Sequence, residues 1–214
     1  MRRSLSGLAR GLVVLACLAQ GACAAALQLA RPESPRLYEL TPPAAFAAGL
    51  PEVAARLAVE VPSTTAGLNV ARIALRPTPT TLEHYARASW IDVVPVMVQN
   101  LLIETLDNAG RLDVLGRGVV GVRADYALLS HVREFQAVYR GPGAPQVRVR
   151  LQARLVRLPR RESLAATSAE AVVQAEGTSM PAIVLAFDQA FDQAARRVVE
   201  WTIEQAAAAT PAGS

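Results

Sequence analysis

Lysine is absent from this chain, and cysteine is nearly so. All 22 basic residues are therefore arginine, and with 18 acidic residues they leave a net charge of only +4. Three of these arginines, Arg2, Arg3 and Arg10, stand at the N-terminus. A nucleic-acid-binding domain concentrates its basic residues in a patch or along one helix, and no such concentration is present. We therefore expect no nucleic acid among the partners.

The two cysteines, Cys17 and Cys23, both precede the region that can fold. No disulfide can therefore hold the folded region together. Histidine is also scarce, because His84 and His131 alone are present, and neither has a cysteine or paired carboxylates at ligand spacing. The motifs of zinc proteases, serine hydrolases and nucleotide-binding loops are missing as well. We expect no metal, no cofactor and no catalytic residue.

One glycine-rich segment, Gly116–Gly121, matches the G-x-G-x-x-G pattern of dinucleotide-binding sites. Such a site needs a helix that begins after the glycines, so that its N-terminus faces the pyrophosphate. The residues that follow Gly121 alternate between polar and apolar as a strand does. We therefore interpret the glycines as a turn.

The N-terminal segment has the order of a bacterial export signal. Arginines come first, an apolar run of about nine residues follows, and small residues come next. The run is too short to span a bilayer. Because Cys23 follows Gly21 and Ala22, we predict a signal peptide over residues 1–22 and a diacylglycerol on the Cys23 sulfur. Gln20 stands where a leucine is usual, so two alternatives stay open: lipidation at Cys17, or release of a soluble periplasmic protein by cleavage near Ala24–Ala26.

The rest of the chain divides into three parts. Residues 23–36 contain Pro32 and Pro35 without a clear period, so they are predicted to form a lipidated tether. Residues 37–206 are long enough for one sizeable core and are predicted to be a single domain. Residues 207–214 are predicted to be a flexible tail. No second apolar run reaches the length of about 18 residues that a membrane-spanning helix needs.

Two segments have the periodicity of amphipathic helices. The first is predicted to begin at an N-cap at Asp92, with Pro95 in its first turn, and to end at Gly110. The second is predicted to begin at an N-cap at Ser179. Their buried stripes are predicted at Val94, Val98, Leu101, Leu102, Thr105, Leu106 and Ala109, and at Val184, Phe187, Phe191, Ala194, Val198 and Trp201.

Alternating apolar residues predict the strands of a sheet. A change of phase near Arg133 and Glu134 predicts a β-bulge. Residues 63–67 are predicted to form a turn, and residues 82–90 a short helix or an extended lead-in. The predicted strands cover residues 37–40, 57–61, 70–76, 112–115, 125–139, 147–158 and 164–175. The order of elements indicates an α+β fold, with two principal helices packed on a mainly antiparallel sheet.

Two groups of side chains are candidates for contact with a partner or with lipid headgroups. Arg148, Arg150 and Arg154 share the polar face of one predicted strand, where they can meet lipid phosphates, an acidic partner or only water. Tyr85 and Trp90 precede the first helix. They are predicted either to contact a partner or to close the edge of the core.

Several segments together resemble one known family. The segment 37–42, with the sequence L-Y-E-L-T-P, is similar to a Tyr-x-Leu-x-Pro opening, and residues 85–92 read Tyr-x4-Trp-x-Asp before the first helix. The strand Ala124–Leu128 follows, Phe135 stands at a usual aromatic position, and an alanine-rich helix ends near Trp201. This combination resembles the auxiliary lipoproteins of ABC-type transport systems that work with mammalian-cell-entry (MCE) proteins.

The resemblance implies a non-enzymatic lipoprotein in the outer membrane that faces the periplasm. It implies docking on an MCE-domain protein and on an ABC permease–ATPase complex, self-association into a homo-oligomer, and an accessory role in phospholipid transport between the two membranes. A different class also fits the residues, namely an envelope lipoprotein that scaffolds or activates a cell-wall enzyme.

The predicted anchor can be tested by substitution. We expect Cys23→Ala to abolish membrane association of the full chain, because the sulfur that carries the acyl chains is gone. Mass spectrometry of the mature N-terminus should find an acylated Cys23 in the wild type. Cys17→Ala is the control and should leave the anchor in place. A wild-type protein that retains residues 1–22 would refute the prediction.

Overall fold

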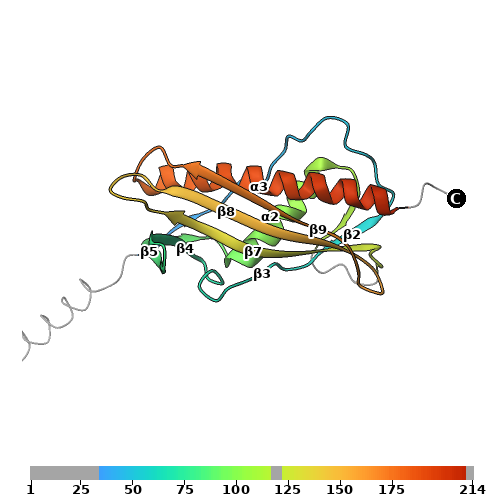
Figure 1. The fold of residues 1–214 in the computed structure, drawn as a ribbon, viewed down its shortest axis with the longest axis horizontal. Coiled ribbons are helices and arrows are strands. Elements are labelled where there is room, and N and C mark those ends of the chain that lie inside the picture. Colours follow the sequence, from blue (N-terminus) through green and yellow to red (C-terminus); the bar gives the residue numbers. More distant parts are fainter. Residues whose placement is uncertain (1–33, 117–121, 211–214) are drawn as a thin grey trace, which may run out of the picture. The chain divides into compact units, whose positions relative to one another are not determined.

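A computed structural model describes residues 34–116 and 122–210, and in this part of the chain the sheet is organised around one long strand. Strand β7 (Tyr126–Val138) pairs antiparallel with β8 (Gln146–Arg157), which pairs antiparallel with β9 (Glu162–Gln174). These three strands are the longest arrows in Figure 1. The β7–β8 register shifts between Val132 and Glu134, which confirms the predicted bulge.

The other edge of β7 is shared by three short strands that follow one another along it in parallel orientation. They are β2 (Arg56–Val59), β3 (Ser63–Thr64) and β4 (Arg72–Thr78). β4 forms an antiparallel hairpin with β5 (Thr81–Trp90). Two further parallel strands complete the sheet: β1 (Arg36–Tyr38) beside β5, and β6 (Asp113–Leu115) beside β2. The sheet is thus mixed, with its longest ladders antiparallel, and the predicted α+β class is confirmed.

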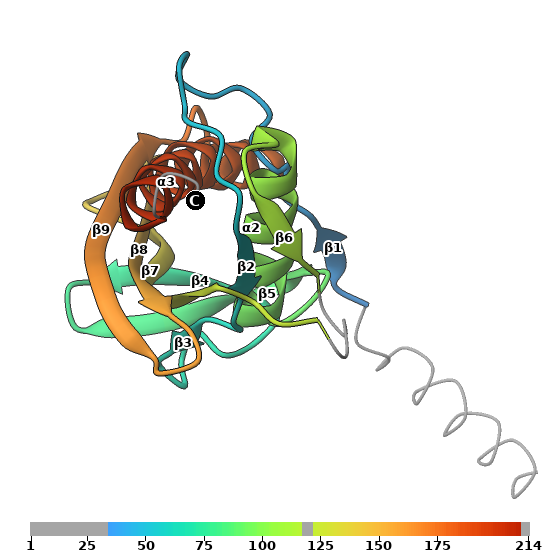
Figure 2. The same cartoon turned by 90° about the vertical axis from the view of Figure 1, so that its right-hand side faces the viewer.

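Two helices pack on this sheet: α2 (Val94–Ala109) and α3 (Met180–Ala209). Figure 2 shows β7, β8 and β9 curling around α3. The helix α3 and strand β9 contact each other through small side chains. Helix α3 buries several alanines there, and β9 buries Ala169 and Ala171. No helix among the described residues combines the length and apolar character needed to cross a bilayer.

Three aromatic rings form the centre of the core. Trp90 at the end of β5 meets Phe135 of β7 and Phe187 of α3, with ring centroids 5.6 Å and 5.1 Å away. Phe135 and Phe187 contact each other at 5.3 Å. Because all three rings are at most 1 % exposed, they join a hairpin, the central strand and a helix into one core.

The predicted helix ends are confirmed at three points and wrong at one. Gly110 ends α2 with a left-handed backbone (φ 61°), Pro95 lies in the first turn, and Ser179 Oγ accepts from Ala182 N at 3.4 Å. The N-cap of α2 is Val93, however, and not Asp92. The Asp92 carboxylate accepts from the adjacent Val93 amide at 2.7 Å, one residue before the helix, so it does not reach the first turn.

For residues 82–90 the extended alternative is confirmed and the helical one is wrong, because these residues belong to strand β5 and pair with β4. Two further predictions needed correction. Ser63 and Thr64 form β3 and not a turn, because β7 offers a free edge to them. Helix α3 continues to Ala209, beyond the predicted end of the domain at residue 206, because Ala206 is buried in the core. Residues 1–33, with Cys23, and most of Gly116–Gly121 lie outside the described residues.

The aromatic centre predicts a large effect of one substitution. We expect Phe187→Ala to lower the free energy of unfolding by about 3–5 kcal/mol, because it leaves a cavity between Trp90 and Phe135. Denaturant titration measures this change. Leu185→Ala is the control on the same helix, since Leu185 is 48 % exposed, and it should cost less than about 0.5 kcal/mol. Similar losses at both positions would show that the core is not centred on these rings.

Candidate contact surface

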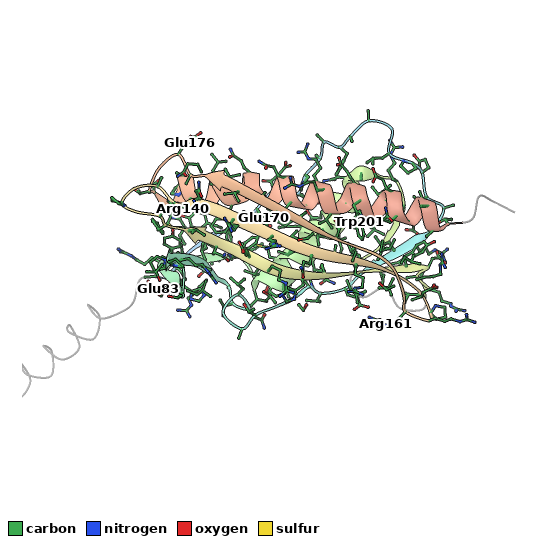
Figure 3. All side chains as sticks on the ribbon, viewed as in Figure 1. Glu83, Arg140, Arg161, Glu170, Glu176 and Trp201 are labelled. Atoms are coloured by element: carbon green, nitrogen blue, oxygen red, sulfur yellow. The ribbon has the colours of Figure 1, made fainter. Side chains whose placement is uncertain are left out.

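The predicted arginines lie on the side of the sheet that faces away from α3. Along β8 every second side chain, from Val147 to Leu155, is buried under the helix, and the side chains between them point outward. We name this outer surface the arginine face. The arginine face includes Glu170 of β9, which is labelled in Figure 3. The face is formed by Arg133, Glu134, Arg148, Arg150, Gln152, Arg154 and Glu170.

Two of the three predicted arginines are neutralised by carboxylates. Arg148 Nε lies 3.4 Å from Glu134 Oε2 and 3.6 Å from Glu170 Oε1. Arg150 Nε lies 3.9 Å from Glu170 Oε2. Because these side chains are partly exposed, the pairs stabilise the fold by no more than about 1 kcal/mol. Their main effect is that this half of the arginine face has no net charge.

The other half of the face is different. Arg154 Nη1 donates to the neutral hydroxyl of Ser163 at 3.2 Å, and Arg133 Nε donates to the side-chain oxygen of Gln152 at 2.8 Å. Within residues 34–116 and 122–210, neither arginine forms an ion pair with a carboxylate. Positive charge is therefore concentrated at this end of the face.

A hollow of about 320 Å³ opens beside Arg154. Four strands contribute to its lining, with Ser63 from β3, His131 from β7, Gln152 and Arg154 from β8, and Thr167 from β9. Sequence reasoning missed this hollow because β3 and β7 are far apart in the chain. Only their parallel pairing brings Ser63 beside His131.

The Ser63 and His131 side chains form a hydrogen bond of 2.8 Å between Oγ and Nδ1. Burial, and then the nearby Arg133, lower the pKa of His131, so its imidazole is neutral at pH 7. A catalytic Ser–His pair needs a third group that orients the ring. In the described part of the chain no carboxylate contacts His131, and its Nε2 is buried without a hydrogen-bond partner. Among the described residues, the pair therefore lacks the third group of such a triad.

His84, the other histidine, has a structural partner. Its Nε2 lies 2.9 Å from the carbonyl oxygen of Gly67. No cluster of three or more potential metal ligands occurs among the described residues.

Trp90 is not a surface residue, so the prediction that it contacts a partner is wrong. Its side chain is 1 % exposed because the indole fills the space between Phe135 and Phe187. Tyr85 remains partly exposed, and its hydroxyl lies 2.9 Å from that of Tyr139. A partner contact of Tyr85 therefore stays a prediction.

A second surface of opposite charge lies between β1 and α2. A hollow of about 540 Å³ is lined there by Glu39, Asp92 and Glu104, with Ile91 among them. The Ile91 side chain is 50 % exposed, and Leu37 on β1 is 62 % exposed. We name this hollow the acidic groove. Its residues come from three separate segments, so the sequence pattern did not reveal it.

Comparison with known proteins gives a consistent result. A family model described as ABC-type transport auxiliary lipoprotein component matches residues 38–199. The crystal structure of protein XCC0632 from Xanthomonas campestris, of family model DUF330, is 26 % identical, with a TM-score of 0.74 over 79 % of this chain and 95 % of that one. The crystal structure of an uncharacterized protein shares the fold at 14 % identity, with a TM-score of 0.61 over 79 % and 99 % of the two chains.

One curated protein is also similar over most of this chain. The uncharacterized protein bll6063 of Bradyrhizobium diazoefficiens is 28 % identical over 166 residues, which are 78 % of this chain and 44 % of that protein. This chain thus spans less than half the length of that relative.

The environment of Tyr85 predicts an alkaline loss of stability. Burial, followed by the hydrogen bond with Tyr139, raises the pKa of Tyr85 far above its ordinary value. The folded state therefore favours the neutral phenol, and its contribution is complete below about pH 10 and is lost as the pH rises further. We expect Tyr85→Phe to flatten the fall in unfolding free energy above that pH. Denaturant titrations at several pH values measure this free energy. An unchanged slope in Tyr85→Phe would show that Tyr85 does not cause the alkaline loss of stability.

Proposed function

Since the chain belongs to the ABC-type transport auxiliary lipoprotein family, we propose that it is a non-enzymatic accessory component of an MCE-type system that moves phospholipids across the periplasm. The family match over residues 38–199 carries this proposal. The described fold supports it, because the domain presents two charged surfaces, the arginine face and the acidic groove, to other molecules. Such a molecule works by binding and positioning other components.

The proposal assigns the N-terminus to membrane attachment. Residues 1–22 direct export, Cys23 carries the acyl chains, and the molecule is held at the outer membrane facing the periplasm. A fully extended tether over residues 23–36 reaches at most about 50 Å. The folded domain therefore works close to the membrane that holds its anchor.

The two charged surfaces give the domain two kinds of contact. The arginine face suits anionic headgroups or an acidic partner, and Tyr85 lies on the neighbouring β4–β5 hairpin. The acidic groove combines carboxylates with the exposed apolar side chain of Ile91. It suits a basic, partly apolar segment of the MCE-domain protein or of the permease. Self-association of several copies belongs to the same proposal.

Affinity capture tests this assignment. The full chain with a C-terminal tag, cross-linked in its own cells and extracted in non-ionic detergent, should recover an MCE-domain protein together with an ABC permease. We expect Glu104→Arg in the acidic groove to reduce that recovery several-fold, because it reverses the charge that attracts the partner.

Glu83→Arg is the matched control, since Glu83 is also an exposed glutamate but lies on β5, away from the acidic groove. It should leave recovery unchanged. Recovery of a cell-wall synthase in place of the transport proteins would favour the scaffold alternative. Recovery of neither would leave the proposal without support.

A further inference from the structure

We propose that the hollow beside Arg154 is a binding site for a phosphate ester. The site consists of Ser63, His131, Gln152, Arg154 and Thr167, with Arg133 at its margin. This assignment goes beyond the proposed transport role and does not depend on it, because it follows from the charges and hydrogen-bonding groups that four strands bring together.

The first argument is the distribution of charge. Glu134 and Glu170 lie beside Arg148 and Arg150 and neutralise them. Among the described residues, Arg154 bonds only to the neutral hydroxyl of Ser163, and no aspartate or glutamate lines the hollow. An anion that enters therefore meets an uncompensated guanidinium and no opposing charge. The planar fork of a guanidinium matches the oxygen spacing of phosphate.

The second argument is the set of groups around that guanidinium. Ser63 adds a hydroxyl from the β3 side of the hollow, and Gln152 adds an amide whose oxygen already accepts from Arg133. That hydrogen bond orients the Gln152 amide and keeps Arg133 near the site. Phosphate oxygens accept hydrogen bonds, and the Arg154 guanidinium and the Gln152 amide nitrogen can donate them.

The third argument is the state of His131. The groups that face it are Arg133 on its own strand, Gln152 and Arg154 on β8, and Ser63 on β3. Burial and the arginine charge lower its pKa while the hollow is without an anion. A bound phosphate would reverse part of this effect, because a negative charge favours the imidazolium. The histidine therefore reports directly on occupancy.

The dimensions limit the ligand. A volume of about 320 Å³ is at the small end of the usual range for small-molecule sites, which is about 300–1,000 Å³. The hollow admits a phosphate with a few attached atoms. The same chemistry occurs in two ligands: a phospholipid headgroup, with its chains outside the hollow, and a water-soluble phosphate ester.

Histidine NMR can test the site in the full chain, because His84 and His131 are the only histidines in the sequence. The protein, labelled in its imidazole nitrogens and held in an uncharged detergent, is titrated with glycerol 3-phosphate or with dihexanoyl phosphatidylglycerol. We expect a saturable change in the His131 resonances and a rise in the His131 pKa. The His84 resonances should stay in place and show that the fold is intact.

Two variants separate the site from general charge attraction. Arg154→Gln should weaken binding by roughly tenfold or more, because one charge-assisted contact is lost. Arg148→Gln, on the same strand face but paired with carboxylates, should change affinity by less than about twofold.

The two ligands distinguish the two sources. Binding of glycerol 3-phosphate at least as tight as that of the lipid supports a soluble ester as ligand, and tighter binding of the lipid supports a headgroup. Absence of a saturable His131 response to both ligands would overturn the proposal. Equal losses in Arg154→Gln and Arg148→Gln would also overturn it. Neither result bears on capture of transport proteins, so the two proposals fail independently.

Discussion

The alternation of side chains along β8, held in register by β7 on one edge and β9 on the other, determines most of what this domain presents. Val147, Leu151 and Leu155 point to one side and are completely buried under α3. The alternate residues Arg148, Arg150, Gln152 and Arg154 therefore point to the other side, where arginines predominate. A slip of one residue in either ladder would put guanidinium groups into the core. The core and the arginine face are thus consequences of a single register.

The bulge in β7 divides that face into two electrostatic halves. The β7–β8 register shifts between Val132 and Glu134, so Arg133 has no partner residue on β8. On one side of the bulge, Glu134 opposes Arg150 in the ladder and lies next to Arg148, and the charges cancel. On the other side, Arg133 and Arg154 have only neutral hydrogen-bond acceptors. One extra residue in a strand thereby produces a local surplus of positive charge on a face that is otherwise balanced.

Sequence patterns predicted what depends on neighbours along the chain. Helical and alternating periods identified α2, α3 and the long strands. Gly110 ends α2 and Ser179 precedes the first residue of α3, as predicted from the backbone freedom of glycine and the capping hydroxyl of serine. The diffuse family resemblance agreed with the family match over residues 38–199. The period did not decide between helix and extended chain at residues 82–90, where pairing with β4 determines the structure. It likewise left open whether Trp90 contacts a partner or closes the edge of the core, and the structure shows that Trp90 joins β5 to α3.

The site itself depended on distant pairing. The alternation along its strand identified Arg154 as an outward-facing residue. That Glu134 and Glu170 pair with Arg148 and Arg150, and not with Arg154, depends on how β7, β8 and β9 are paired, which the sequence pattern does not give. Ser63 and Thr167 had no distinguishing pattern at all. They become neighbours of His131 and Arg154 only because β3 and β9 lie on the two sides of the β7–β8 pair.

The outer edge of β9 has a further consequence for the behaviour of the protein at high local concentration. Among the described residues, this strand pairs with β8 alone, and an unpaired edge of that length is a template on which other chains can add strands and aggregate. Arg197 of α3 donates to the Glu170 carbonyl and so occupies one of the free acceptors. The helix therefore blocks one position of an edge on which other chains could otherwise add strands.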